Sequence, residues 1–134
     1  MSPTNIIRSL TYIEEKTRLI LLDARGGARA AASHEKVDIK EFWRFYKEII
    51  PYLETYAAQI NIEQISHHTR LFIQYRDAME AYQKRRTWFW YIFLSGDRFR
   101  DDLKTEEYIQ LLQDICNNIS NFIYQVKINA EEAM

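Results

Sequence analysis

The segment 83–100, with the sequence QKRRTWFWYIFLSGDRFR, holds the side chains best suited to bind another molecule. Five cations bracket a run of aromatic and apolar residues, and they are Lys84, Arg85, Arg86, Arg98 and Arg100. Cations of this kind bind phosphate oxygens, and aromatic rings between them can stack on bases. The pattern indicates contact with a DNA or RNA backbone, to which Arg25 and Arg29 would contribute. The alternative is a solvated rim around a protein interface.

Seven consecutive apolar residues, Trp88–Leu94, lie inside the same segment and predict an interface. On a helix such a run covers the whole circumference and must be buried on every side. A small bundle cannot easily surround one of its own helices, and aromatic residues beside arginines are typical of interface cores. We therefore expect a homo- or hetero-oligomer whose contact includes Trp88, Trp90, Tyr91 and Ile92. The alternative is a monomer in which the preceding helices wrap this segment.

Arg29 and His34, separated by four residues, are the one pair that resembles an enzyme's catalytic residues. Their spacing is similar to that in HEPN-type ribonucleases, which are small all-helical bundles. The resemblance covers two residues, and position 30, which is usually polar in that family, is alanine here. It implies cleavage of RNA by Arg29 and His34. We expect no catalysis and keep a ribonuclease as an alternative.

The remaining sequence contains no pattern typical of a cofactor or metal site. It has no glycine-rich phosphate loop, no paired cysteines and no His-Glu-x-x-His motif. Glu63 and His67 are four residues apart, and a solvated surface pair is the better interpretation. His68 and Cys116 are expected to be a hydrogen-bonded core histidine and a small buried residue. We expect no cofactor, no metal and no small-molecule substrate.

Composition favours helices. Among 134 residues there are only three glycines and two prolines, which argues against turn-rich β folds. The net charge of −1 excludes a strongly basic nucleic-acid binder, but the first hundred residues carry +4 and the rest −5. One side of the molecule can therefore face a polyanion. The single cysteine fits a reducing compartment, and the uncharged stretch Thr87–Gly96 is about half the ~20 residues that span a bilayer. We expect no membrane span and a cytoplasmic location, or a virion if the chain is viral.

The N-terminal residues predict a helix that ends near Arg25. Pro3 suits the first helical position, and Gly26-Gly27 breaks the helix. Apolar residues recur at helical spacing between these points, at Ile6, Leu10, Ile13 and Ile20. We expect residues 1–37 to form a helical arm with a Gly-Gly joint, and residues 38–134 to form the bundle core.

Three further helices are predicted in that core. The second begins at Ile39 after a capping box of Asp38 and Glu41. Its apolar stripe continues through Pro51, which predicts a kinked continuous helix, with two helices meeting at Ile50 as the alternative. The stripe consists of Phe42, Tyr46, Ile49, Leu53, Tyr56 and Ile60.

The third helix is expected over Ile62–Ser95, with a break near Lys84–Thr87 as the alternative. The last helix follows an N-cap at Thr105. The apolar stripes of these two helices comprise Ile65, His68, Phe72, Tyr75, Met79, Tyr82, Arg86, Phe89 and Phe93, and then Tyr108, Leu112, Ile115, Ile119, Phe122 and Val126.

These elements predict an all-α fold, an up-and-down bundle of about four helices with an N-terminal helical arm. For function we expect a non-enzymatic helical subunit that self-associates through the aromatic segment and contacts a nucleic-acid backbone. In architecture such a subunit is similar to helical coat proteins of filamentous archaeal viruses and to small helical subunits of CRISPR effector complexes. The alternatives are an adaptor or inhibitor that binds a protein partner, and the ribonuclease.

Overall fold

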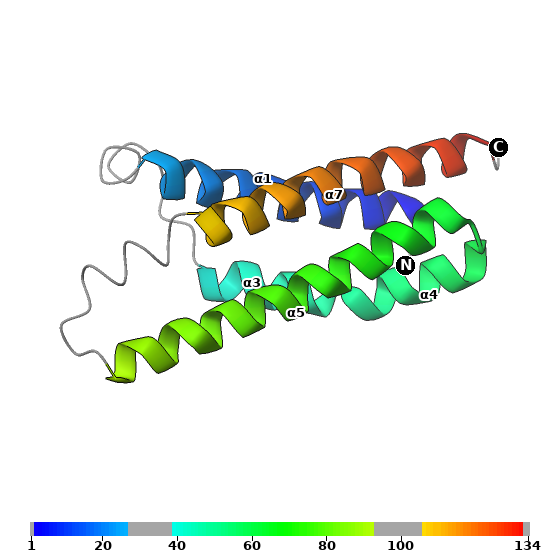
Figure 1. Ribbon diagram of the computed structural model, residues 1–134. Helices are drawn as coiled ribbons and strands as arrows, with labels where there is room; N and C mark the ends of the chain where they lie inside the picture. The colour runs from blue at the N-terminus through cyan, green and yellow to red at the C-terminus, as the bar shows by residue number, and fades with distance from the viewer. Residues whose placement is uncertain (1, 27–38, 93–105, 133–134) are drawn as a thin grey trace.

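The computed structural model describes the backbone of residues 2–26, 39–92 and 106–132, and the side chains of residues 2–22, 40–84 and 106–131 (Figure 1). Helices account for nearly all of these residues, and no strand occurs among them. The helices are α1 (Pro3–Gly26), α3 (Ile39–Glu48), α4 (Ile50–Ile60), α5 (Glu63–Ile92) and α7 (Glu106–Glu132). The predicted all-α class is confirmed.

The helices form an up-and-down bundle. Because α3 and α4 follow one another along one line, the described helices make four rods, and successive rods run in opposite directions (Figure 1). α1 packs most extensively on α7, α7 also packs on α5, and α5 packs on α4, whereas α1 meets α3 over a short stretch. The bundle is therefore tightly packed along three sides and loosely packed along the fourth.

One hydrophobic core runs through all the rods. The predicted apolar stripes supply it, because residues three and four apart share one face of a helix. Burial of each such side chain contributes about 1.5–3 kcal/mol. The apolar residues with no exposed surface are Ile6, Leu10, Tyr46, Leu53, Ile65, Phe72, Leu112, Ile115, Ile119, Phe122 and Val126.

The N-terminal helix contributes side chains to this core. Ile6, Leu10 and Ile13 are 0–2% exposed, and α1 has its most extensive contact with α7. The physical reason is the breadth of the buried surface of α7, where Leu111 and Leu112 are both buried and so require neighbours on two sides. The expected boundary at residue 37 lies outside the described residues and stays a prediction.

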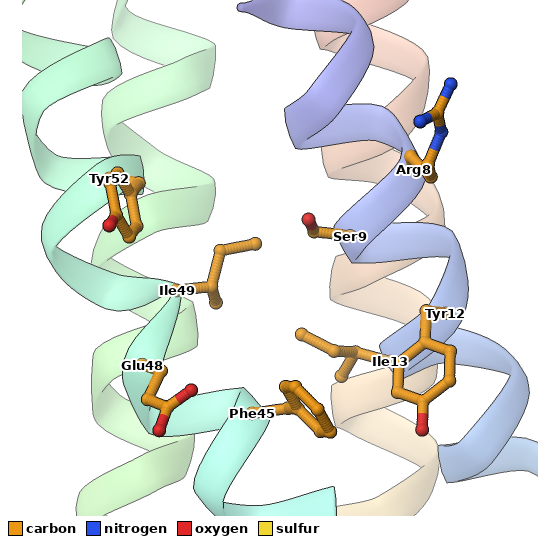
Figure 2. Close-up of a pocket in the computed structure, with 8 residues that line it drawn as sticks. All are labelled: Arg8, Ser9, Tyr12, Ile13, Phe45, Glu48, Ile49 and Tyr52. Carbon is orange, nitrogen blue, oxygen red and sulfur yellow. The ribbon is translucent and has the colours of Figure 1, made fainter. Parts of the chain in front are cut away.

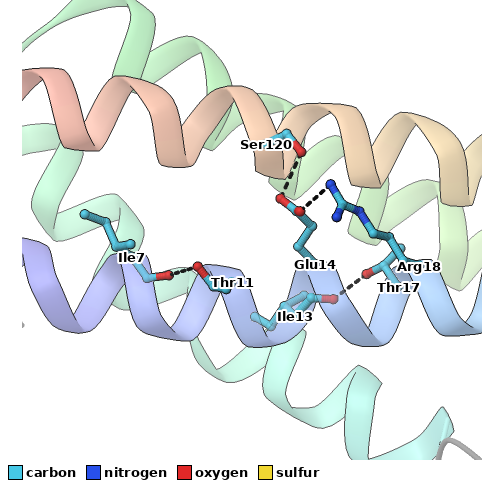
Figure 3. A network of polar contacts seen from close by, with 7 residues as sticks. All are labelled: Ile7, Thr11, Ile13, Glu14, Thr17, Arg18 and Ser120. Atoms are coloured by element: carbon cyan, nitrogen blue, oxygen red, sulfur yellow. Dashed lines mark hydrogen bonds and ion pairs between the residues drawn. The ribbon is translucent and has the colours of Figure 1, made fainter.

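Polar contacts also hold α1 against α7 (Figure 3). The Ser120 hydroxyl donates to one carboxylate oxygen of Glu14 at 2.9 Å, and Arg18 contacts the other at 2.6 Å. The Glu14 side chain is only 12% exposed, so this pair is sheltered on one side. The buried Thr17 hydroxyl donates to the Ile13 carbonyl at 2.6 Å. The polar groups drawn in Figure 3 therefore all have partners.

The second predicted helix is divided near Pro51, so the alternative with two helices is correct. Proline has no N–H to donate to the carbonyl one turn earlier, and this ends α3 at Glu48. Ile49 nevertheless keeps helical angles, with φ −74° and ψ −21°, and its carbonyl accepts from the N–H of Leu53 at 3.1 Å. The backbone therefore continues in the same direction, and the apolar stripe passes through the break.

A tight turn at Asn61 joins α4 to α5. Asn61 has left-handed angles, φ 56° and ψ 42°, and its N–H donates to the Ala57 carbonyl at 2.9 Å. α5 then runs without a break to Ile92, so it is continuous through residues 84–87. The predicted extension of this helix to Ser95 lies outside the described residues.

Candidate functional site

The C-terminal end of α5 projects past the helices beside it. Tyr82 stacks on Tyr108 of α7 with 5.4 Å between ring centroids, and Lys47 Nζ of α3 lies 3.8 Å from a Glu80 carboxylate oxygen. Because α7 runs antiparallel to α5, the stacked tyrosines place its first residue, Glu106, level with about residue 84. At 1.5 Å per residue, residues 85–92 extend ~12 Å beyond the start of α7. α3 also begins short of the end of α5 (Figure 1). Figure 1 shows this projecting end in yellow-green.

The predicted binding residues divide into three groups. Lys84 is exposed on α5. The backbone of Arg85, Arg86, Trp88, Trp90, Tyr91 and Ile92 lies on the projecting end of α5, and that of Arg25 lies in the last turn of α1. Arg29, His34, Arg98 and Arg100 lie outside the described residues, so the ribonuclease pair and these cations stay predictions.

A hollow of about 510 Å³ lies between the outer face of α3 and α5. Its lining residues are Lys40, Trp43, Arg44, Lys47, Glu48 and Gln83. The three cations recur after four and three residues, so they share one face of α3. Lys84 directly follows Gln83, which brings these cations next to the predicted basic segment. The sequence patterns did not single out Lys40, Arg44 and Lys47, although their helical spacing could have indicated a common face.

The charges around this hollow are held by weak, exposed ion pairs. Arg44 Nε lies 3.9 Å from a Glu48 carboxylate oxygen, and both side chains are 61% exposed. The Lys47–Glu80 pair is 3.8 Å long, with side chains 46% and 40% exposed. Pairs of this kind contribute about 0–1 kcal/mol. Arg44 and Lys47 can therefore exchange these carboxylates for a competing anion.

An aromatic column forms the floor beneath the cations. Trp43 stacks on Tyr46 with ring centroids 4.9 Å apart, and Tyr46 stacks on Phe72 of α5 at 3.9 Å. The Tyr46 hydroxyl donates to the Phe72 carbonyl at 2.7 Å. Lys47 lies over the Trp43 ring, 5.8 Å from its centroid. This column fixes α3 on α5 and gives the exposed cations a rigid base.

Tyr46 in this column and the nearby Tyr75 both have altered acidity. Burial raises the pKa of the Tyr46 hydroxyl well above its ordinary value, and the nearby Tyr75 adds to the effect. Burial also raises the pKa of Tyr75, with a further contribution from the Asp114 carboxylate. Both groups stay protonated at neutral pH, so their shifts concern stability and give no sign of acid–base catalysis.

An apolar groove of about 480 Å³ opens on the loosely packed side, between α1 and the α3–α4 rod (Figure 2). Figure 2 shows residues of both rods around it, namely Arg8, Ser9, Tyr12, Ile13, Phe45, Glu48, Ile49 and Tyr52. Tyr12 and Tyr52 are 39% and 51% exposed, whereas Ile13 and Ile49 are buried. Sequence patterns could not reveal this groove, because it depends on the spacing between two rods.

The other residues considered for chemistry have structural roles. The Nδ1–H of His68 donates to the Asn118 amide oxygen at 2.9 Å, and the Asn118 amide donates to the His68 carbonyl at 3.1 Å. Cys116 is buried, as predicted. Glu63 pairs with Arg70 at 2.7 Å. Among the described residues, no group of three histidine, cysteine or acidic side chains is arranged to hold a metal ion.

No protein-family model matches this chain, and neither the curated proteins nor the solved structures include a significant match. In the described part of the chain, none of the helices combines the length and the apolar content needed to span a bilayer. Function must therefore be argued from the three surfaces described above.

Proposed function

We propose that the protein is a non-enzymatic α-helical subunit of a larger assembly and that it associates with further chains through the end of α5. The projection of residues 85–92 past α3 and α7 carries this proposal. Trp88, Trp90, Tyr91 and Ile92 lie in this stretch, and consecutive apolar residues on a helix require neighbours on every side. In the described part of the chain, α7 does not extend alongside these residues, and we propose that a second chain supplies their neighbours.

The proposal includes contact with a nucleic-acid backbone. Lys84, Arg85 and Arg86 precede the aromatic residues, with Thr87 between them and Trp88, so an assembly built through this end places cations close to each junction. The remaining predicted contacts are Arg25, Arg29, Arg98 and Arg100. Such a subunit acts as a coat-like protein or as a small subunit of a nucleoprotein complex, in the cytoplasm or in a virion.

Replacement of Trp90 with glutamate tests the self-association. A carboxylate in an apolar interface is costly to bury, so Trp90→Glu is expected to yield monomers while the wild type forms oligomers. Sedimentation velocity over a range of concentrations measures the association, and circular dichroism checks that the helices persist. Tyr124→Glu is the matched control, because Tyr124 is 62% exposed on α7. A wild type that stays monomeric at high concentration, or a Trp90→Glu variant that still assembles, would contradict the proposal.

The apolar groove favours a second candidate function, that of an adaptor for a partner helix. Grooves of this kind receive the apolar face of an amphipathic helix, and large apolar surfaces rimmed by polar groups mark interaction sites. Arg8 and Glu48 supply the polar rim, and Tyr12 and Tyr52 line the walls. In the same sedimentation assay, association lost in Tyr52→Glu but kept in Trp90→Glu would favour the groove as the interface.

A further inference from the structure

The outer face of α3 presents its three cations in a line. Lys40, Arg44 and Lys47 span seven residues, which corresponds to ~10 Å along the helix axis. Each strand of duplex DNA carries one charge per ~3.4 Å of helix axis, so a line of this length lies alongside several phosphates. Gln83 of α5 lines the same hollow, and Lys84 follows it in sequence. We name Lys40, Arg44 and Lys47 the α3 basic face.

The balance of charge in the hollow favours an anionic ligand. Among its described lining residues, three cations stand against one carboxylate, Glu48. The start of α3 at Ile39 adds the positive end of a helix dipole beside Lys40. Within the part of the chain that the structure describes, Glu41 and Glu80 are further acids in this neighbourhood. Because the ion pairs made by Glu48 and Glu80 are exposed and long, phosphate oxygens can displace these carboxylates from the cations.

The same face is poorly suited to a protein partner. Trp43 is the one aromatic side chain among the described lining residues, and at 8% exposed it offers little surface to an incoming side chain. Cores of protein interfaces contain large apolar anchors and few lysines. Interfaces with nucleic acids are polar and strongly positive. The lining therefore favours a nucleic acid over an acidic protein.

We infer that the α3 basic face binds the phosphate backbone of a nucleic acid without reading its bases. The inference rests on the nucleic-acid contact in the proposed function and extends it to three residues outside the basic segment. The aromatic column beneath Lys47 holds the face in place before the ligand arrives, so little ordering of α3 is needed on binding. Long lysine and arginine side chains then reach separate phosphates.

The test is the salt dependence of binding to a fluorescein-labelled oligothymidine, followed by fluorescence anisotropy. Each phosphate contact on a single strand contributes about 0.7 to the slope of log affinity against log salt. Combined substitution of Lys40→Gln, Arg44→Gln and Lys47→Gln is expected to lower that slope by about two. The matched control removes three cations elsewhere, with Lys16→Gln, Arg70→Gln and Lys127→Gln, and should keep the wild-type slope.

Several outcomes would overturn the inference. They are a wild type that does not bind the oligothymidine, a triple variant with the wild-type slope, and a control that loses as much slope as the triple variant. Equal binding of polyglutamate by the wild type would instead assign the face to an acidic protein. Sedimentation without nucleic acid measures self-association alone. A failure of the assembly proposal can therefore be distinguished from a failure of the α3 basic face to bind nucleic acid. Circular dichroism and urea unfolding exclude loss of the fold in each variant.

Discussion

Tyr46 makes the packing of α3 on α5 sensitive to pH. Its ring has no exposed surface and stacks on Phe72, and its hydroxyl donates to the Phe72 carbonyl. Burial raises the pKa of this hydroxyl, because the phenolate is poorly solvated inside the core. The apolar stripe predicted that Tyr46 would be buried. It could not predict the hydrogen bond, since Phe72 belongs to another helix.

Because the pKa of Tyr46 is raised, the folded protein is expected to lose stability at alkaline pH. The unfolded chain loses the proton near pH 10, whereas the folded chain retains it to higher pH. The contribution is fully present below pH ~10 and is lost as the pH rises above it, by up to about 1.4 kcal/mol per pH unit. The urea midpoint of the wild type should therefore fall between about pH 9 and about pH 11.

Tyr46→Phe is expected to flatten that dependence. The variant loses one hydrogen bond, which lowers the free energy of unfolding at neutral pH by about 1 kcal/mol. At alkaline pH, this variant should lose less additional stability than the wild type does. Part of the pH dependence that remains comes from Tyr75, whose pKa is also raised. Tyr124→Phe, at an exposed position, is the control and should follow the wild type. Identical pH profiles for Tyr46→Phe and the wild type would rule out this account.

Helix starts and apolar stripes were predictable because they depend on local sequence. The starts at Pro3 and Ile39 follow from the proline and from the capping box, and α7 begins directly after the predicted cap at Thr105. The break near Pro51 was less predictable, because the stripe has the same period on both sides. The spacing of apolar residues shows which face of a helix is buried, but it does not show whether one backbone hydrogen bond is missing.

The turn at Asn61 allows a test of the link between α4 and α5. A left-handed conformation costs a residue with a branched side chain about 1–2 kcal/mol, whereas glycine adopts it freely. Asn61→Val is therefore expected to lower the free energy of unfolding by about 1–2 kcal/mol, and Asn61→Gly should preserve it or raise it slightly. Urea unfolding measures both, with Asn117→Val at an exposed helical position as the control. Equal stability of Asn61→Val and Asn61→Gly would show that the turn is not constrained in this way.

At the scale of the whole molecule, a candidate surface made by one segment can be singled out from the sequence, whereas a surface made by two segments cannot. The basic and aromatic segment that ends α5 is a run of neighbours in sequence, so composition alone singled it out. The α3 basic face needs α3 beside the end of α5, and the apolar groove needs α1 spaced from α4. Both depend on how the rods pack, which the stripes leave undetermined.

The place of α1 in the bundle leads to the last prediction, deletion of residues 1–25. Five buried apolar residues would be lost, namely Ile6, Leu10, Ile13, Ile20 and Leu21. Their burial contributes roughly 7–15 kcal/mol, which is comparable to the ~5–15 kcal/mol that stabilises a typical domain. The deletion also uncovers the apolar face of α7. The truncated chain is therefore expected to lose cooperative thermal unfolding and to bind a hydrophobic dye.

A peptide of residues 1–25 added in trans provides the positive control for this deletion. It should restore a cooperative transition monitored by circular dichroism, because the same buried contacts re-form when the peptide packs on α7. A peptide with Leu10→Glu should fail, since it places a carboxylate at a position with no exposed surface. If the truncated chain instead melts cooperatively by itself, residues 39–132 close a bundle without α1. The N-terminal helix would then be the separable arm that the Gly-Gly joint suggests, free to pack on a neighbouring subunit.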